Sequence, residues 1–117
     1  MATYSRQLLS GSTNGKPIPV VAIATIGTTI HTAIAGTTAF DEVYLWVNNT
    51  SAAAITMTIE WGAAGTGSQM ATAYSIPANS APTPIIFGQV LQNGLLLTIF
   101  ASVASVLNVT GYVNRIV

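Results

Sequence analysis

The chain has 117 residues, of which 50% are hydrophobic and 5% charged, with three basic and three acidic side chains. A typical soluble domain carries about 25% charged residues, and a soluble monomer usually needs a charged surface without apolar patches. We therefore expect one domain with a single core, whose surface is covered in part by neighbouring subunits. The absence of cysteine excludes disulfides and thiolate metal ligands.

Several classes of partner are disfavoured by the same composition. Zero net charge and scattered basic residues argue against nucleic acid, because neutralising phosphates requires clustered Lys or Arg. The apolar runs are short and interrupted by Pro, Gly, Asn and Thr, so we expect no membrane span, which needs about 20 apolar residues. The first six residues are polar and no apolar segment follows directly, so we expect no signal peptide.

Residues 1–16 are predicted to form an extended N-terminal arm. They carry two of the three basic residues, Arg6 and Lys16, and they end in a cluster of Gly, Ser, Thr and Asn. The pair Leu8 and Leu9 could anchor the arm to this domain or to a neighbour. An ordinary flexible terminus is the alternative.

Residues 17–117 are predicted to form a single all-β domain, an antiparallel β-sandwich for which a jelly roll is one fitting topology. No helix of ordinary length shows a 3.6-residue periodicity. The Asn93-Gly94 dipeptide between two apolar runs predicts a hairpin. Turn signals separate the predicted strands, which are 18–25, 29–34, 42–49, 54–61, 71–76, 84–91, 95–101 and 106–116.

Alternation within the strands assigns side chains to faces. Met57, Ile59 and Trp61 share one face and are predicted to pack in the core, whereas Glu60 falls on the opposite, wet face. The strand 95–101 is apolar on both faces. Such a strand is either central between two layers or covered by another subunit.

Catalysis has few side chains to use. The single histidine, His31, would need an orienting carboxylate and a nucleophile, and the sequence places none of the three carboxylates near it. We interpret His31 as a solvated or subunit-contacting strand residue, and Asp41 and Glu42 as solvating the start of a strand. A glycosidase pair built on Glu60 would depend on an accident of folding. We predict no catalytic residue, no cofactor and no metal site; calcium remains an open alternative without support.

The aromatic side chains leave two kinds of binding open. Trp46 and Tyr44 lie opposite Leu45 and are candidates for exposed or interfacial rings. Buried interfaces favour Trp and Tyr as anchors, and few polar residues are available to hold sugar hydroxyls. A protein interface is therefore favoured over a carbohydrate site that uses Trp46, Tyr44 and Tyr74. The predicted interface residues are Arg6, Leu8, Leu9, Tyr44, Trp46, Phe100 and Tyr112.

The last two-thirds of the chain resembles small structural proteins of tailed bacteriophages. The similar features are "YLWVNNT" at 44–50, "TIEWG" at 58–62, "IPA" at 76–78, "LQNGL" at 91–95, "FAS" at 100–102 and "GYVNRI" at 111–116. The resemblance implies a virion component made in the host cytoplasm and placed on the capsid surface. This would be a capsid decoration (cement) protein, a type that is often trimeric. Its partners would be the major capsid protein and further copies of itself.

A cement protein acts by burying surface at many repeated contacts, and small, neutral faces suit this because little charge is desolvated. The arm 1–16 could reach a capsid subunit or a sister protomer. Two alternatives stay open: a carbohydrate-binding or host-adhesion module, and a tail or head–tail connector subunit.

Overall fold

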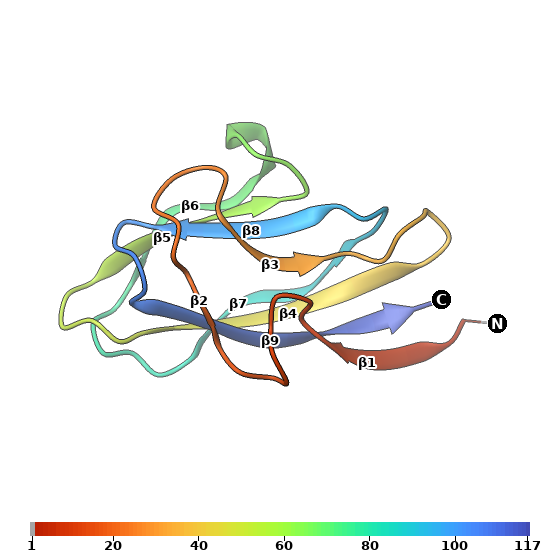
Figure 1. Ribbon diagram of the computed structural model, residues 1–117, viewed down its shortest axis with the longest axis horizontal. Coiled ribbons are helices and arrows are strands. Elements are labelled where there is room, and N and C mark those ends of the chain that lie inside the picture. The colour runs from red at the N-terminus through yellow and green to blue at the C-terminus, as the bar shows by residue number, and fades with distance from the viewer. Residues whose placement is uncertain (1) are drawn as a thin grey trace.

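Nine strands in the computed structural model form two antiparallel sheets that enclose the core between their inner faces (Figure 1). The structure describes residues 2–117. The predicted all-β sandwich is confirmed, and seven of the eight predicted strands match observed ones to within about two residues. Within the described residues, the model contains no helix long and apolar enough to cross a membrane.

We call the two layers sheet A and sheet B. Sheet A has the order β1-β9-β4-β7, with β2 also paired to β9. Its strands are β1 (Tyr4–Leu8), β2 (Ile18–Pro19), β4 (Phe40–Asn49), β7 (Thr83–Leu91) and β9 (Leu107–Ile116). Sheet B has the order β3-β8-β5-β6. Its strands are β3 (Thr28–Thr32), β5 (Ile55–Trp61), β6 (Gln69–Ile76) and β8 (Leu96–Ala101), and a short 3-10 turn, η1 (Thr66–Ser68), precedes β6.

The core follows from alternation in the central strands. In β4, every second residue points inward, and Val43, Leu45 and Val47 are fully buried. Met57 and Ile59 on β5 meet them from sheet B. Each such side chain contributes roughly 1.5–3 kcal/mol on burial. Trp61, at the end of β5, is partly buried and packs against this core as predicted.

One glycine is required where the two central strands of sheet A meet. Gly111 on β9 lies opposite Leu45 and has a φ of 154°. A Cβ at this position would lie 2.0 Å from the carbonyl oxygen of Tyr44, which belongs to the rigid backbone of β4. Only glycine therefore permits β9 and β4 to approach as they do.

Part of the predicted N-terminal arm forms an edge strand of sheet A. Strand β1 pairs with β9 over five residues, from Tyr4 opposite Ile116 to Leu8 opposite Tyr112. Immediately afterwards the chain turns inward, so Leu9 is 1% exposed while Leu8 remains 55% exposed. The leucine pair thus anchors this segment to its own domain through Leu9.

The predicted strand 18–25 is wrong for most of its length. Only β2 forms, and residues 20–27 leave sheet A, cross to sheet B and fold over its outer face (Figure 1). The amide of Ala101 donates to the carbonyl of Ala22 at 3.0 Å, which holds the loop to the edge of β8. We call this segment loop 20–27. It lies over part of the outer face of β8, where Thr98 is buried and Phe100 partly buried, while Leu96 on the same face stays 41% exposed.

The hairpin predicted at Asn93-Gly94 is also wrong. The Asn93-Gly94 turn forms with positive φ at both residues, but it joins β7 of sheet A to β8 of sheet B. The stretch 44–61 likewise spans β4 and β5, which lie in different sheets. Both turns are connections between the layers, because each flanking strand finds its partners elsewhere in the chain.

Candidate interaction surface

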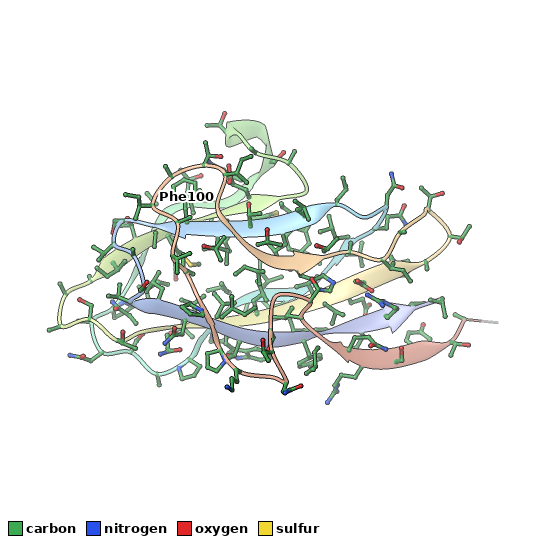
Figure 2. All side chains as sticks on the ribbon, viewed as in Figure 1. Phe100 is labelled. Carbon is green, nitrogen blue, oxygen red and sulfur yellow. The ribbon has the colours of Figure 1, made fainter. Side chains whose placement is uncertain are left out.

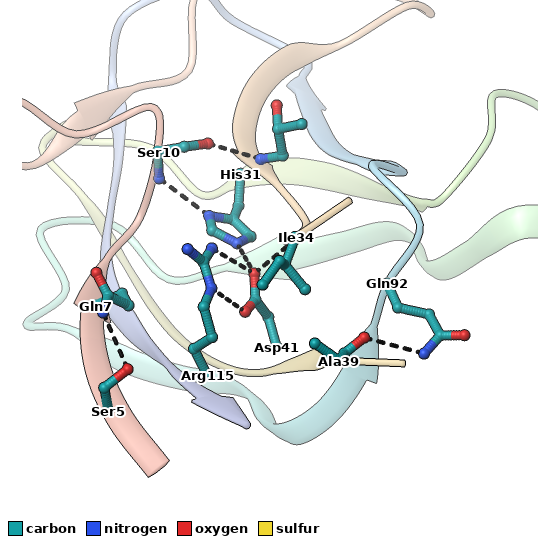
Figure 3. A network of polar contacts seen from close by, with 10 residues as sticks. Ser5, Gln7, Ser10, His31, Ile34, Ala39, Asp41, Gln92 and Arg115 are labelled. Atoms are coloured by element: carbon teal, nitrogen blue, oxygen red, sulfur yellow. Dashed lines mark hydrogen bonds and ion pairs between the residues drawn. The ribbon is translucent and has the colours of Figure 1, made fainter. Parts of the chain in front are cut away.

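The prediction that His31 is solvated is wrong, as is the prediction that Asp41 solvates a strand start. Asp41 is 0% exposed and His31 1% exposed. His31 Nε2 lies 2.8 Å from Asp41 Oδ2, and Arg115 donates to both carboxylate oxygens, from Nε at 2.8 Å and Nη2 at 3.0 Å (Figure 3). Residues 41 and 115 are far apart in sequence and are brought together by the pairing of β4 with β9, whereas the packing of sheet B on sheet A brings His31 to them.

Both ring nitrogens of His31 are used in the structure. The amide of Ser10 donates to Nδ1 at 3.0 Å, so the proton of the neutral ring lies on Nε2, which donates to Asp41. Burial alone would raise the pKa of Asp41. The hydrogen bonds from Arg115 and His31 outweigh burial and hold that pKa below its ordinary value. This network joins β3, β4 and β9 and leaves His31 no free nitrogen for a substrate.

Glu60 was predicted on a wet face but is 1% exposed. Its Oε2 accepts from the Thr25 hydroxyl at 2.6 Å and the Gly65 amide at 3.1 Å. Its Oε1 accepts from the Thr98 hydroxyl at 3.2 Å and the Gly27 amide at 3.3 Å. Burial would raise the pKa of Glu60, but these four donors lower it overall. Glu60 does lie on the face opposite Met57 and Ile59, as predicted. Loop 20–27 covers that face at Glu60 and shields the carboxylate from solvent.

These buried groups account for much of the chain's polar chemistry. Across residues 2–117, every buried side-chain nitrogen or oxygen has a hydrogen-bond partner. In the same part of the chain, no group of three or more His, Asp or Glu side chains is close enough to hold a metal ion. Asp41 and Glu60 are therefore structural residues of two separate networks.

An aromatic cluster lies on the outer face of sheet A and contains four of the predicted interface residues. The rings of Tyr44 on β4 and Tyr112 on β9 stack with centroids 5.0 Å apart and planes at 21°. Trp46 lies 6.0 Å from Tyr112, tilted by 30°. The guanidinium of Arg6 on β1 lies over the Tyr112 ring, 4.4 Å from its centroid. Cross-strand register places a fifth predicted residue, Leu8, beside Tyr112 on this face.

Strand order determines which ring faces remain free in this cluster. Because β9 lies between β1 and β4, Arg6 and Tyr44 approach Tyr112 from opposite sides. Both faces of the Tyr112 ring are therefore covered. Tyr112 presents an edge to a partner and has no free face on which a sugar could stack.

The remaining predicted residues lie elsewhere. Leu9 is in the core. Phe100 is partly buried on β8, beside Ile23 of loop 20–27, on the sheet B side of the molecule (Figure 2). Tyr74 belongs to β6 of sheet B, so it does not form one platform with Tyr44 and Trp46.

A second apolar region, not predicted as such, follows the open side of the sandwich. Edge strands β6 and β7 flank a shallow groove of about 300 Å³, whose lining includes Met70, Tyr74 and Phe87. Met70 is 45% exposed, Tyr74 51% and Phe87 66%. Alternation within one strand could not reveal this groove, because it depends on two sheet edges lying side by side.

Comparison with known proteins identifies no relative of this chain. No protein-family model, no curated protein and no solved structure matches this chain.

Proposed function

We propose that this chain is a non-enzymatic structural protein of a bacteriophage virion, of the capsid decoration type. In this proposal it is made in the host cytoplasm, self-associates, and stabilises the phage head by binding the major capsid protein on its outer surface. The resemblance described above implies the phage setting. The small number of charged side chains on the surface supports a role in which that surface contacts other proteins.

The observation that carries the proposal is how few charges the surface retains. Of the six charged side chains, Asp41 and Glu60 are buried and Arg115 is paired with Asp41. The surface is left with Arg6, Lys16 and Glu42. Yet its area, 5929 Å², is about what a monomer of this mass exposes. Such a surface is far less charged than a soluble monomer normally needs.

Large apolar side chains occupy much of the same surface. They are found on both sheets and on loop 20–27, and several are more than half exposed. Patches of this kind mark protein contacts. The prominent ones are Tyr4 70%, Ile26 70%, Phe87 66%, Ile23 64%, Val21 56%, Leu8 55%, Val90 53% and Tyr74 51%.

A role in binding rather than catalysis is supported by the state of the histidine. A general base must reach the proton it abstracts. His31 is 1% exposed, with one nitrogen bonded to Ser10 and the other to Asp41. Its hydrogen bond to Asp41 links β3 of sheet B to β4 of sheet A.

The proposal is tested on phage particles. Purified chain is mixed with phage heads that lack it, the heads are sedimented through a sucrose cushion, and the pellet is imaged by cryo-electron microscopy. We expect saturable binding and density on the outer capsid surface at symmetry-related positions. Density at the tail or neck would favour a connector subunit, and failure to sediment with heads would contradict a decoration role.

The number of copies is measured separately by light scattering. Self-association is expected at micromolar concentration, and the phage resemblance implies a trimer. A monomer at that concentration would contradict the self-association part of the proposal while leaving capsid binding open to its own test.

A further inference from the structure

The groove at the open side of the sandwich is apolar and carries no charge. Edge strand β6 of sheet B and edge strand β7 of sheet A flank it. Met70, Tyr74 and Phe87 are the most exposed side chains of its lining, and no lining residue is charged. The groove therefore has nothing to attract a charged ligand, and covering it would remove apolar surface from water.

Strand β6, which borders this groove, is the least protected of the four sheet edges. Natural edges are protected by charged side chains, proline, shortness or a covering segment. Strand β1 is short and contains Arg6, and β7 contains Pro84. The edge of β3 is covered, because the amide of Gly11 donates to its Ile30 carbonyl at 3.0 Å. Strand β6 has eight residues, none of them charged or proline, and only a bulge at 72–73 interrupts its edge.

The same chain carries an apolar protrusion, loop 20–27, on the sheet B side of the molecule (Figure 1). All eight residues of the loop are uncharged. Its side chains Val21, Ile23 and Ile26 are 56%, 64% and 70% exposed. The chain therefore presents an uncharged convex surface in addition to the uncharged groove.

Loop 20–27 is already fixed in place in the single chain. The amides of Val21 and Ala22 both donate to Thr28 Oγ1 at 3.0 Å. The other end of the loop donates to the buried carboxylate of Glu60. A protrusion that is ordered before binding loses little conformational entropy when it binds, so the loop is preorganised for insertion.

We infer that loop 20–27 of one copy inserts into the β6–β7 groove of the next copy, and that three copies close into a ring through this contact. The contact is heterologous, because it joins two different surfaces of the same chain. The inference rests on the self-association in the proposed function and names the two surfaces that perform it.

The placement of the two surfaces favours a ring. The loop lies over the outer face of sheet B, whereas the groove opens at the adjoining side, between the edges of the two sheets. A two-fold pair would need both surfaces to face one partner, and surfaces on opposite sides would continue into a filament. Adjoining sides that point in different directions suit a closed ring of few copies, and the trimer of the proposed function is such a ring.

A second copy is the chosen occupant because the chain itself supplies the matching chemistry. Neither surface is charged, so the contact desolvates no ion. Each copy uses its loop once and its groove once, and the contact that closes the ring forms within one assembly. Modest contacts can therefore add up to a stable trimer. The aromatic cluster on sheet A is left available for a different partner.

The first test places a carboxylate in each surface and measures mass by sedimentation equilibrium. The wild-type protein is expected at three times the chain mass of 12.1 kDa. Ile23→Asp in the loop and Phe87→Asp in the groove should each raise the dissociation constant by about tenfold or more, because an unpaired charge would be buried. Tyr4→Asp is the matched control and should leave the constant unchanged. Tyr4 is 70% exposed, like Phe87 at 66%, but lies on β1 at the opposite edge of sheet A.

The second test uses the absence of cysteine from the chain. The single-cysteine variants Ile23→Cys and Phe87→Cys are mixed, allowed to exchange subunits, and treated with a short bismaleimide cross-linker. Head-to-tail insertion predicts dimers cross-linked between the two variants, and much less cross-linking when either variant is treated alone. Cross-linking of each variant to itself, without the mixed product, would indicate a two-fold contact and contradict the ring.

Folding is checked independently of association. Both substituted positions are more than half exposed, so each variant is expected to keep the wild-type circular dichroism spectrum and unfolding midpoint.

A wild-type dimer, or a trimer that both aspartate variants leave intact, would overturn the inference and leave the self-association of the proposed function standing. A wild-type monomer would remove both. The capsid role is measured separately, by sedimenting the monomeric Ile23→Asp variant with phage heads, and that result bears on the proposed function alone.

Discussion

The hydroxyl of Thr25 donates to Glu60 Oε2 at 2.6 Å, so a carboxylate on β5 holds a loop that precedes it by 35 residues. Gly27 and Thr98 donate to the other oxygen of the same carboxylate. One side chain therefore ties loop 20–27 to the outer face of sheet B. Glu60 is the charged residue whose replacement should be most informative about how that loop is held.

Glu60→Gln is expected to lower the free energy of unfolding by roughly 1–3 kcal/mol. The amide group of glutamine would present a donor where the carboxylate now accepts from two donors, leaving buried groups unsatisfied. Urea denaturation measures the change. Glu42→Gln, at a partly exposed position on β4, is the control and should change stability by less than about 0.5 kcal/mol. Equal stability of the two variants would contradict the role given to Glu60.

Stability should decrease in acid. The pKa values of Asp41 and Glu60 are lower in the folded chain than their ordinary values of 3.8 and 4.5. Each carboxylate therefore contributes stability that is complete above its ordinary value and is lost as the pH falls through its folded value. Urea denaturation between pH 3 and 7 should show a plateau above about pH 5.5 and a decline below about pH 4.5. The decline should be shallower in Asp41→Asn, and an unchanged slope would contradict the assignment.

Arg115→Met should destabilise the fold by about 3 kcal/mol. The substitution removes both hydrogen bonds from the guanidinium and leaves the Asp41 carboxylate buried beside His31 alone among charged or titratable neighbours. The pKa of Asp41 should rise, so the acid loss of stability should begin at higher pH. Lys16→Met, at an exposed turn position, is the matched control. Thermal unfolding at pH 7 and pH 4 distinguishes the two variants.

Gly111→Ala should lower stability by roughly 2–4 kcal/mol, or prevent folding. The added Cβ would lie 2.0 Å from the Tyr44 carbonyl oxygen, so β4 and β9 would have to separate beneath the aromatic cluster. Gly67→Ala is the control, because a Cβ there meets nothing within 4 Å. Soluble yield and the unfolding midpoint report the result. If the two alanine variants are equally stable, the close approach of the strands is not a constraint on the fold.

Much of the fold follows from local pattern. Alternation predicts β4, whose inward residues are all buried, and it predicts the core position of Met57 and the outward position of Trp46. The same reasoning fails for loop 20–27, because an apolar β-branched run is equally compatible with a strand and with a segment that covers a sheet. The choice between them depends on a contact with Glu60 that sequence spacing cannot reveal.

The location of the predicted interface residues is also something that local sequence pattern does not reveal. Arg6, Leu8, Tyr44, Trp46 and Tyr112 come together because β1 and β4 both pair with β9, and that strand order is not encoded in any one segment. Their residue types indicate contact with a partner, whereas their common location comes only from topology. Leu9 and Phe100 share the residue types but lie in the core and under loop 20–27.

Loop 20–27 gives the molecule two unlike sides. On the sheet B side, the loop covers Glu60 and presents Val21, Ile23 and Ile26 outward. A single buried carboxylate on β5 thus fixes where three exposed apolar side chains lie. A variant that loosens the loop would alter the outer surface on the sheet B side without replacing any residue on that surface.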